Sequence, residues 1–313
     1  MIPWSTVKLV RAFFATLAMA ALAQTGLAQE PMRYIYPAPE SALDHRLEYY
    51  WGLLGAALDA SRSSYGPYEM RKSHEGMNAA RVAASLESAA PSTGAITVAV
   101  LNSSAAREKS LLAVKIPLDK GLTGYRMFLI KQATQDRLDN VQTARDLQAI
   151  SFGQGSKWVD SEILQAAGMH VELSMTYEGL FQMLNAERFQ VFPRGVNEIA
   201  DELVRHKASM PELAIEKNLL LYYPQPRYFF FSSTPEGRRL AKRVSDGLQQ
   251  LINSGEFELR YRQFKTDVLA NLSLAGRRVI RLDNPALSPD TPLANKDLWD
   301  SLSAELKAPS APQ

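Results

Sequence analysis

Few residues of this chain stand in a pattern that is typical of catalysis. The four histidines are dispersed (His45, His74, His170 and His206), and the chain contains no cysteine. Neither a helical pair of histidines nor a cysteine partner is available, so no zinc site is predicted. The sequence also lacks Gly-x-Ser-x-Gly and Gly-x-x-x-x-Gly-Lys motifs, which argues against a serine nucleophile and a nucleotide phosphate loop. We therefore expect no catalytic residue, no metal and no cofactor.

The motif Gly153-Gln154-Gly155-Ser156 is the best candidate for a ligand contact on spacing alone. It follows an apolar run and precedes a helical pattern, so the backbone N–H groups of Gly155 and Ser156 could meet an anion at a helix start. The alternative is an ordinary strand-to-helix turn in which Ser156 caps the helix. The motif lacks the third glycine of a dinucleotide loop. Both interpretations of this motif stay open here.

Apolar periodicity divides the chain into alternating strands and helices. This alternation predicts an α/β fold with mostly parallel sheets covered by helices on both faces. The length of 313 residues corresponds to about two domains. Strands are predicted at 33–36, 68–71, 96–101, 125–130, 149–152, 171–173, 189–192 and 228–232, and helices at 44–60, 77–88, 157–167, 177–184, 196–206 and 240–251.

The first 28 residues have the pattern of a secretory signal peptide. Lys8 and Arg11 precede an apolar run at 12–23, and small residues lead to Ala28. That run is shorter than the ~20 residues that span a bilayer, although an uncleaved anchor is the alternative. We expect cleavage after Ala28, or else after Ala23. Without cysteine the mature chain cannot carry a lipid anchor, so we expect a soluble protein in the periplasm.

The charge balance argues against a nucleic-acid partner. The chain has 35 basic and 33 acidic residues, and removal of the two basic residues in 1–28 leaves 33 of each. Such a chain has no excess of cations to neutralise phosphates.

The order of these features resembles the type II periplasmic solute-binding proteins, most closely the polar amino-acid-binding family 3, over residues 32–270. The features, in chain order, are the segment 102–109 after a strand, a crossover of the chain to a second lobe near Pro117, the Gly-x-Gly-Ser motif, and the return of the chain to the first lobe at 222–228. The resemblance implies one lobe at 32–120 plus 226–270, a second lobe at 121–225, and a C-terminal strap with a disordered tail at 271–313. The hinges would lie at 117–124 and 222–228.

The same resemblance implies the function. A small molecule would bind between the lobes, without chemistry, and the closed monomer would be recognised by a membrane permease or a membrane sensor. Two alternatives stay open. One is a ligand-free structural or signalling module, and the other is a periplasmic enzyme on this fold, such as a dehydratase, using Glu40, Asp44 or Glu198.

The resemblance also implies particular ligand-binding residues. The family presents an arginine to the ligand carboxylate from a Ser/Thr-x-x-Arg segment, which is matched here by Ser104 and Arg107. Its Gly-Ser or Gly-Thr pair is matched by Gly155 and Ser156. One position departs from the family, because Arg194 stands where an acid would hold the ligand ammonium group. Either the ligand is not an ordinary amino acid, or Glu198, Glu40 or Asp44 binds its ammonium group. A further alternative is that Arg194 only pairs with Glu198.

Aromatic residues near strand ends and helix starts could form the walls of the cleft. Tyr36 is the last residue of the first predicted strand, at the place where open α/β sheets bind ligands. Tyr177 begins a predicted helix, and Trp158 lies beside the glycine motif. With Arg107 and Arg194 expected on opposite lobes, the sequence predicts that an anionic ligand is preferred over basic and neutral amino acids.

Overall fold

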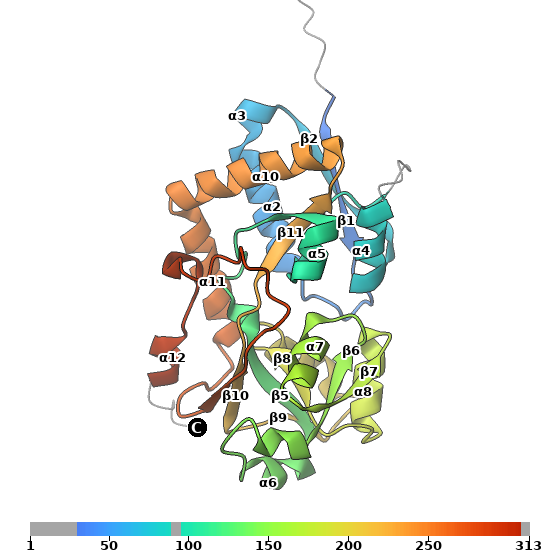
Figure 1. Cartoon of the computed structure of the whole chain (residues 1–313), viewed down its shortest axis with the longest axis vertical. Helices are drawn as coiled ribbons and strands as arrows, with labels where there is room; N and C mark the ends of the chain where they lie inside the picture. Colours follow the sequence, from blue (N-terminus) through green and yellow to red (C-terminus); the bar gives the residue numbers. More distant parts are fainter. Residues whose placement is uncertain (1–29, 89–94, 308–313) are drawn as a thin grey trace, which may run out of the picture.

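The computed structural model describes residues 30–88 and 95–307. These residues form two α/β halves that are stacked along the long axis of the molecule (Figure 1). The predicted signal peptide and the last six residues of the predicted tail lie outside the described ranges. In those ranges no helix is both long and apolar enough to cross a membrane.

The upper half in Figure 1 is organised around the central strand β11. This strand runs antiparallel to both of its neighbours, β3 and β4. The backbone N–H groups of Thr97 and Val98 donate to the Ile35 carbonyl oxygen at 2.9 and 3.3 Å, which joins the parallel pair of β1 and β2 to the same layer. The strands of this half are β1 (Met32–Ala38), β2 (Tyr68–Gly76), β3 (Ala99–Asn102), β4 (Leu111–Val114) and β11 (Arg227–Ser232).

Two helices cover one face of this layer and bury its main core. Helix α10 buries Leu240, Val244, Leu248 and Leu251, as their spacing predicts, and packs on α2. Gly247 permits the close approach, because a Cβ atom there would lie 2.0 Å from the carbonyl oxygen of Ala57. The helices of this half are α2 (Glu48–Ala60), α3 (Arg62–Tyr65), α4 (Ala79–Ser88), α5 (Ala105–Ser110) and α10 (Pro235–Asn253).

The lower half has β5 at its centre, and this strand is buried over almost its whole length. Strands β8, β9 and β10 pair with it in antiparallel orientation, and β12 extends the sheet in parallel beyond β10. Strands β6 and β7 form a parallel pair that a bridge between Phe152 and Val191 connects to the neighbourhood of β8. The strands are β5 (Tyr125–Lys131), β6 (Ser151–Gly155), β7 (His170–Ser174), β8 (Phe192–Gly195), β9 (Leu213–Ile215), β10 (Leu219–Tyr222) and β12 (Arg278–Arg281).

Helices also cover the lower sheet, as predicted. Helix α8 contributes Leu180, Phe181 and Leu184 to one core cluster, and α7 contributes Ile163 and Leu164 to another. The helices of this half are α6 (Gln135–Leu138), α7 (Val159–Ala166), α8 (Tyr177–Asn185) and α9 (Ile199–Lys207), with 3-10 turns at Leu122–Gly124, Gln132–Thr134 and Asp146–Ala149.

The predicted α/β class is confirmed, whereas the predicted predominance of parallel pairing is wrong for β5 and β11. Both strands are antiparallel to their direct neighbours. The reason is that the chain enters these strands from the region between the halves: Arg227 begins β11 beside Asn102, which ends β3. The strands of the strand–helix–strand units run toward that region instead.

The C-terminal part of the chain contacts both halves. Helix α11 (Glu256–Leu269) buries Phe257 in the first core, while Phe264 and Val268 pack against the second. The predicted irregular strap contains β12, a 3-10 turn at Lys296–Leu298 and helix α12 (Ser303–Lys307). The boundaries of the two lobes stay a prediction, and α11 is shared between the two cores.

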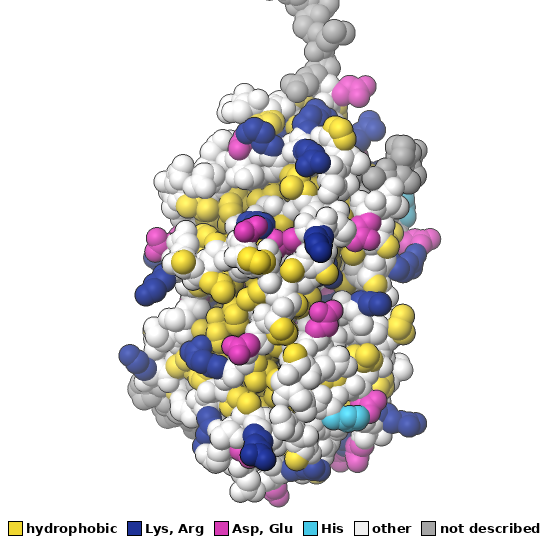
Figure 2. All heavy atoms as spheres, viewed as in Figure 1, with side chains coloured by type: hydrophobic (Ala, Val, Ile, Leu, Met, Phe, Trp, Pro, Cys, Tyr) yellow, Lys and Arg dark blue, Asp and Glu magenta, His cyan; other side chains and the backbone are white. Residues whose placement is uncertain are grey.

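Charged side chains of both signs are interspersed on the face shown in Figure 2. This distribution agrees with the balanced composition of the chain.

Candidate functional site

A cavity of about 290 Å³ lies between the two halves. This volume is close to the lower end of the range for small-molecule sites, so it fits a compact solute. The ends of β1 and β3 reach it from the first half, and the start of β5 and the end of β8 reach it from the second. Its charged lining residues are Glu40, Asp44, Arg46, Glu48, Lys72, Arg107, Arg126, Lys157, Asp160, Arg194, Glu198 and Arg227.

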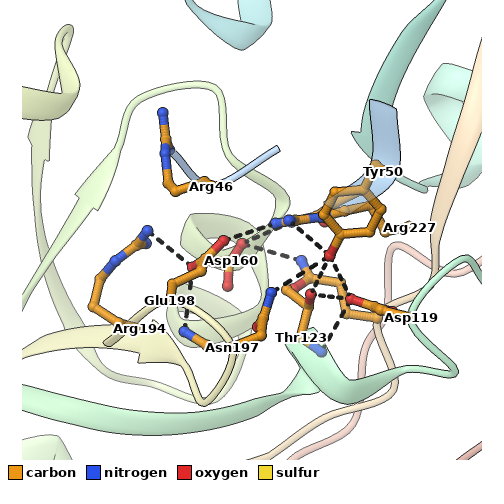
Figure 3. A network of polar contacts seen from close by, with 12 residues as sticks. Arg46, Tyr50, Asp119, Thr123, Asp160, Arg194, Asn197, Glu198 and Arg227 are labelled. Carbon is orange, nitrogen blue, oxygen red and sulfur yellow. Dashed lines mark hydrogen bonds and ion pairs between the residues drawn. The ribbon is translucent and has the colours of Figure 1, made fainter. Parts of the chain in front are cut away.

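Glu198 is the centre of a buried ion cluster beside this cavity (Figure 3). Its carboxylate lies 2.9 Å from a guanidinium nitrogen of Arg194, 3.1 Å from one of Arg227 and 3.7 Å from one of Arg126. Burial alone would raise the pKa of Glu198, but the charges of the arginines outweigh burial and hold the pKa well below its ordinary value. The carboxylate is therefore ionised and fully engaged.

Asp160, at the start of α7, is the second engaged carboxylate. It lies 2.5 Å from a guanidinium nitrogen of Arg126. The hydroxyl of Tyr223 donates to the same carboxylate at 2.6 Å, and the amide of Gln225 donates to it at 3.1 Å. The carboxylate of Asp160 therefore has its hydrogen-bonding capacity used by the protein itself.

Arg194 lines the cavity, but acids of the second half hold its guanidinium. Nε and Nη2 of Arg194 each donate to Glu202 at 2.7 Å, and Nη2 also pairs with Glu198. Burial acts to lower the pKa of Arg194, yet the two carboxylates raise it above its ordinary value. The alternative pairing with Glu198 that the sequence left open is present, together with a second partner in Glu202.

Arg227 and Tyr50 connect the cluster across the two halves. Arg227 donates from Nη1 to the hydroxyl of Tyr50 at 3.2 Å, and Tyr50 donates to Asp119 at 2.8 Å (Figure 3). The amide of Asn197, from the second half, reaches the same hydroxyl at 3.4 Å. The structure therefore holds the two halves in contact on this side of the cavity.

Arg107 differs from the other four arginines of the cavity. It lies in α5, and its Nη1 donates to the backbone carbonyl of Asn102. Among the described residues no carboxylate lies within ion-pair distance of its guanidinium, and burial lowers its pKa. Ser104 does not line the cavity; it caps α5 by accepting the N–H of Arg107 at 3.2 Å. Arg107 is thus a partly desolvated cation that faces the cavity with no acidic partner in the described part of the chain.

Two exposed lysines add to the positive charge of the cavity. Lys72 and Lys157 line it from opposite halves, and neither has an ion-pair partner among residues 30–88 and 95–307. Four of the five acids of the lining pair with arginines: Glu40 and Asp44 with Arg46, Asp160 with Arg126, and Glu198 with Arg194. The fifth, the exposed Glu48, forms a hydrogen bond with His45 at 2.6 Å. With seven arginines and lysines against five acids, the formal charge of the lining is positive.

The structure places the other predicted site residues in different positions. Tyr36 lines the cavity and stacks on Trp51 with 4.5 Å between ring centroids. Gly155, Ser156 and Tyr177 line a much smaller neighbouring pocket of about 20 Å³. Arg107 and Arg194 line one cavity from opposite halves.

The predicted helix start at Gly155 and Ser156 is wrong. Gly155 is the last residue of β6, and the N–H of Ser156 donates to the carbonyl of Ser174 at 2.9 Å. Helix α7 begins only at Val159 and has no side-chain cap. Because parallel pairing with β7 uses the N–H of Ser156, this group is not available to an anion.

Sequence reasoning missed Arg46, Arg126, Asp160 and Arg227 as residues of the site. Arg126 and Arg227 each stand near the first residue of a strand that is otherwise apolar and buried. A charge at such a position is costly unless it is paired or faces a site. This signal could have identified both arginines.

No family model and no curated protein matches this chain. Solved structures do match. The arginine-, lysine- and histidine-binding protein ArtJ of Geobacillus stearothermophilus is 17% identical, with a TM-score of 0.53 over 77% of this chain and 100% of that one. The substrate-binding protein AbpA of Streptococcus pneumoniae, bound to L-arginine, is 16% identical, with a TM-score of 0.53 over 76% and 96%.

A Salmonella typhimurium periplasmic binding protein with high arginine specificity is 12% identical, with a TM-score of 0.53 over 74% of this chain and 98% of that one. At such low identity the likeness concerns the fold. The chain has the two-lobed α/β fold of the amino-acid ABC transporter substrate-binding proteins.

Proposed function

We propose that this protein binds a small carboxylate-bearing solute between its lobes and presents it to a membrane permease or a membrane sensor. One observation carries the proposal: Arg107 faces the cavity with a partly buried guanidinium, and no carboxylate of the described residues lies within ion-pair distance of it. A guanidinium offers a planar set of donors that matches a carboxylate. Binding would favour the closed arrangement by touching both lobes, and no chemistry on the ligand is required.

The engaged acids argue against an ordinary α-amino acid as the ligand. Asp160 and Glu198 are held by buried arginines, and Arg46 holds Glu40 and Asp44. A ligand ammonium group that paired with one of these four acids would have to displace an arginine and leave it buried and unpaired, which is costly. The proposed ligand is therefore anionic, in contrast to the basic amino acids named for the similar structures. Arg194, being paired, contributes less to this preference than Arg107.

A screen of small molecules against the wild-type protein tests the proposal. We expect small organic acids to raise its melting temperature more than lysine, arginine or neutral amino acids do. At a concentration of about 100 times Kd, such a ligand adds about 2.7 kcal/mol to the free energy of unfolding. Mass spectrometry of molecules released from the purified protein gives an independent identification. Stabilisation by lysine or arginine, and by no organic anion, would contradict the proposed anionic ligand.

The proposed location is the periplasm, reached through a cleavable signal peptide at 1–28. The similarity to a periplasmic binding protein supports this location. We expect the mature protein to begin near Gln29 and to appear in the soluble periplasmic fraction. N-terminal sequencing of the fractionated protein checks this, and Met1 on membrane-bound protein would contradict it.

A ligand-free module is the second candidate function. Its support is that most charges of the cavity already neutralise one another within the protein. In that case the purified protein would release no small molecule, and no compound in the screen would shift its melting temperature. The similar structures are binding proteins, which favours a binding function over an enzyme.

A further inference from the structure

Arg46 lies in the loop between β1 and α2 and is held there by two acids of the same loop. Its Nε donates to Oδ1 of Asp44 at 2.7 Å and its Nη2 to Oδ2 at 2.8 Å, which is a bidentate pair. Nη2 also donates to Glu40 at 3.1 Å. The side chain of Arg46 is only 15% exposed, and that of Asp44 only 5%.

The same guanidinium reaches the opposite lobe. Its Cζ atom lies 4.0 Å from the ring centroid of Tyr177 and 5.7 Å from that of Trp158, both in the second half. Ser41, from the same loop as Arg46, donates from its hydroxyl to Glu178 in α8 at 2.7 Å. The loop of the first lobe is therefore docked on the aromatic edge of the second, with the Arg46 cation between acids and rings.

We propose that Arg46 is an internal guanidinium that occupies a cation subsite at the edge of the ligand cavity, and that it thereby sets the charge of the ligands the cleft accepts. Two carboxylates and two aromatic rings form a good binding site for a guanidinium, by bidentate pairing on one side and cation–π contact on the other. While Arg46 fills this subsite, an external cation finds neither acid free. Removal of the Arg46 side chain would leave Asp44 and Glu40 without their cation, next to the ring faces that Arg46 now contacts.

The inference deepens the proposed function, since it explains why the cavity would reject basic ligands, but its test does not depend on that function. The probes are methylguanidinium, which is a small cation, and N-methylurea, which is a neutral molecule of nearly the same shape. We expect the Arg46→Ala variant to be stabilised in thermal-shift and calorimetric measurements by millimolar methylguanidinium, and to bind N-methylurea at least about tenfold more weakly.

A matched control is available on the surface. Arg62 also pairs with an acid, Asp59 at 2.9 Å, and lies over a ring, that of Tyr68 at 5.1 Å, but it is 59% exposed and does not line the cavity. Neither the Arg62→Ala variant nor the wild type should respond to methylguanidinium. The double variant Asp44→Asn, Arg46→Ala should lose the response of the single variant, because its subsite has lost the bidentate acid.

The proposal is overturned if folded Arg46→Ala protein binds both probes equally or binds neither, or if the Asp44→Asn change leaves the response intact. Should Arg46→Ala fail to fold alone, refolding in the presence of each probe gives the answer: recovery with methylguanidinium only supports the subsite, and any other pattern overturns it. If the wild type binds organic acids but methylguanidinium does not stabilise Arg46→Ala, this inference is contradicted and the proposed function stands. If methylguanidinium stabilises Arg46→Ala but the wild type binds no organic acid, the inference about Arg46 stands and the proposed function is contradicted.

Discussion

Replacement of Glu198 by glutamine is expected to lower the free energy of unfolding by about 3–5 kcal/mol. The carboxylate of Glu198 is 2% exposed and contacts three guanidiniums, so its neutralisation leaves buried positive charges facing one another. Glutamine has nearly the same shape, and the loss therefore reports charge and not packing. Urea denaturation followed by circular dichroism and tryptophan fluorescence measures the difference.

The difference between the wild type and Glu198→Gln should also depend on pH. The folded-state pKa of Glu198 lies below its unfolded value, so its charge contributes stability above the unfolded pKa of about 4.3. This contribution is lost progressively as pH falls through that value toward the folded pKa. We therefore expect the difference between the two proteins to be largest near neutral pH and to narrow below about pH 4.3.

Glu48→Gln serves as the control for this prediction. The side chain of Glu48 is 73% exposed, so its replacement should change the free energy of unfolding by less than about 0.5 kcal/mol. If Glu198→Gln changed the free energy of unfolding as little as this control, the ion cluster could not be what holds the two lobes together at this side of the cavity.

Arg107→Ala should weaken binding of the identified acid by roughly 2–5 kcal/mol, because a desolvated ligand charge loses its partner. This corresponds to an increase in Kd of about 30-fold to 5,000-fold. Folding should be almost unaffected, since among the described residues the guanidinium has no acidic partner to lose. Calorimetry with the wild type and the variant measures the change in Kd.

Two further variants sharpen this measurement. Lys109→Ala removes an exposed charge from the same helix α5 and should bind as the wild type does. Arg107→Lys keeps the charge but loses the planar pair of donors, so its affinity should lie between those of wild type and Arg107→Ala. Wild-type affinity in Arg107→Ala would place the ligand elsewhere in the cavity.

The sequence by itself determined the alternation of strands and helices. Periodicity is a local property, and residues such as Leu240, Val244 and Leu248 lie on one helix face whatever the helix packs against. The α/β class followed from this alternation. The direction of β5 and β11 did not, because it depends on which end of a sheet the chain enters after crossing between lobes.

The sequence also indicated that Arg107 and Arg194 would face one cavity from two lobes. Only the tertiary structure decided which of these two charges is left without an acid. Glu202 and Glu198 reach Arg194 because the turn between β8 and α9 folds back on the strand. In the same way, Arg46 meets Tyr177 across the cleft, although 131 positions separate them in the chain. Ion pairs and ring contacts depend on distances of a few ångströms between segments remote in sequence, and residue types alone do not carry those distances.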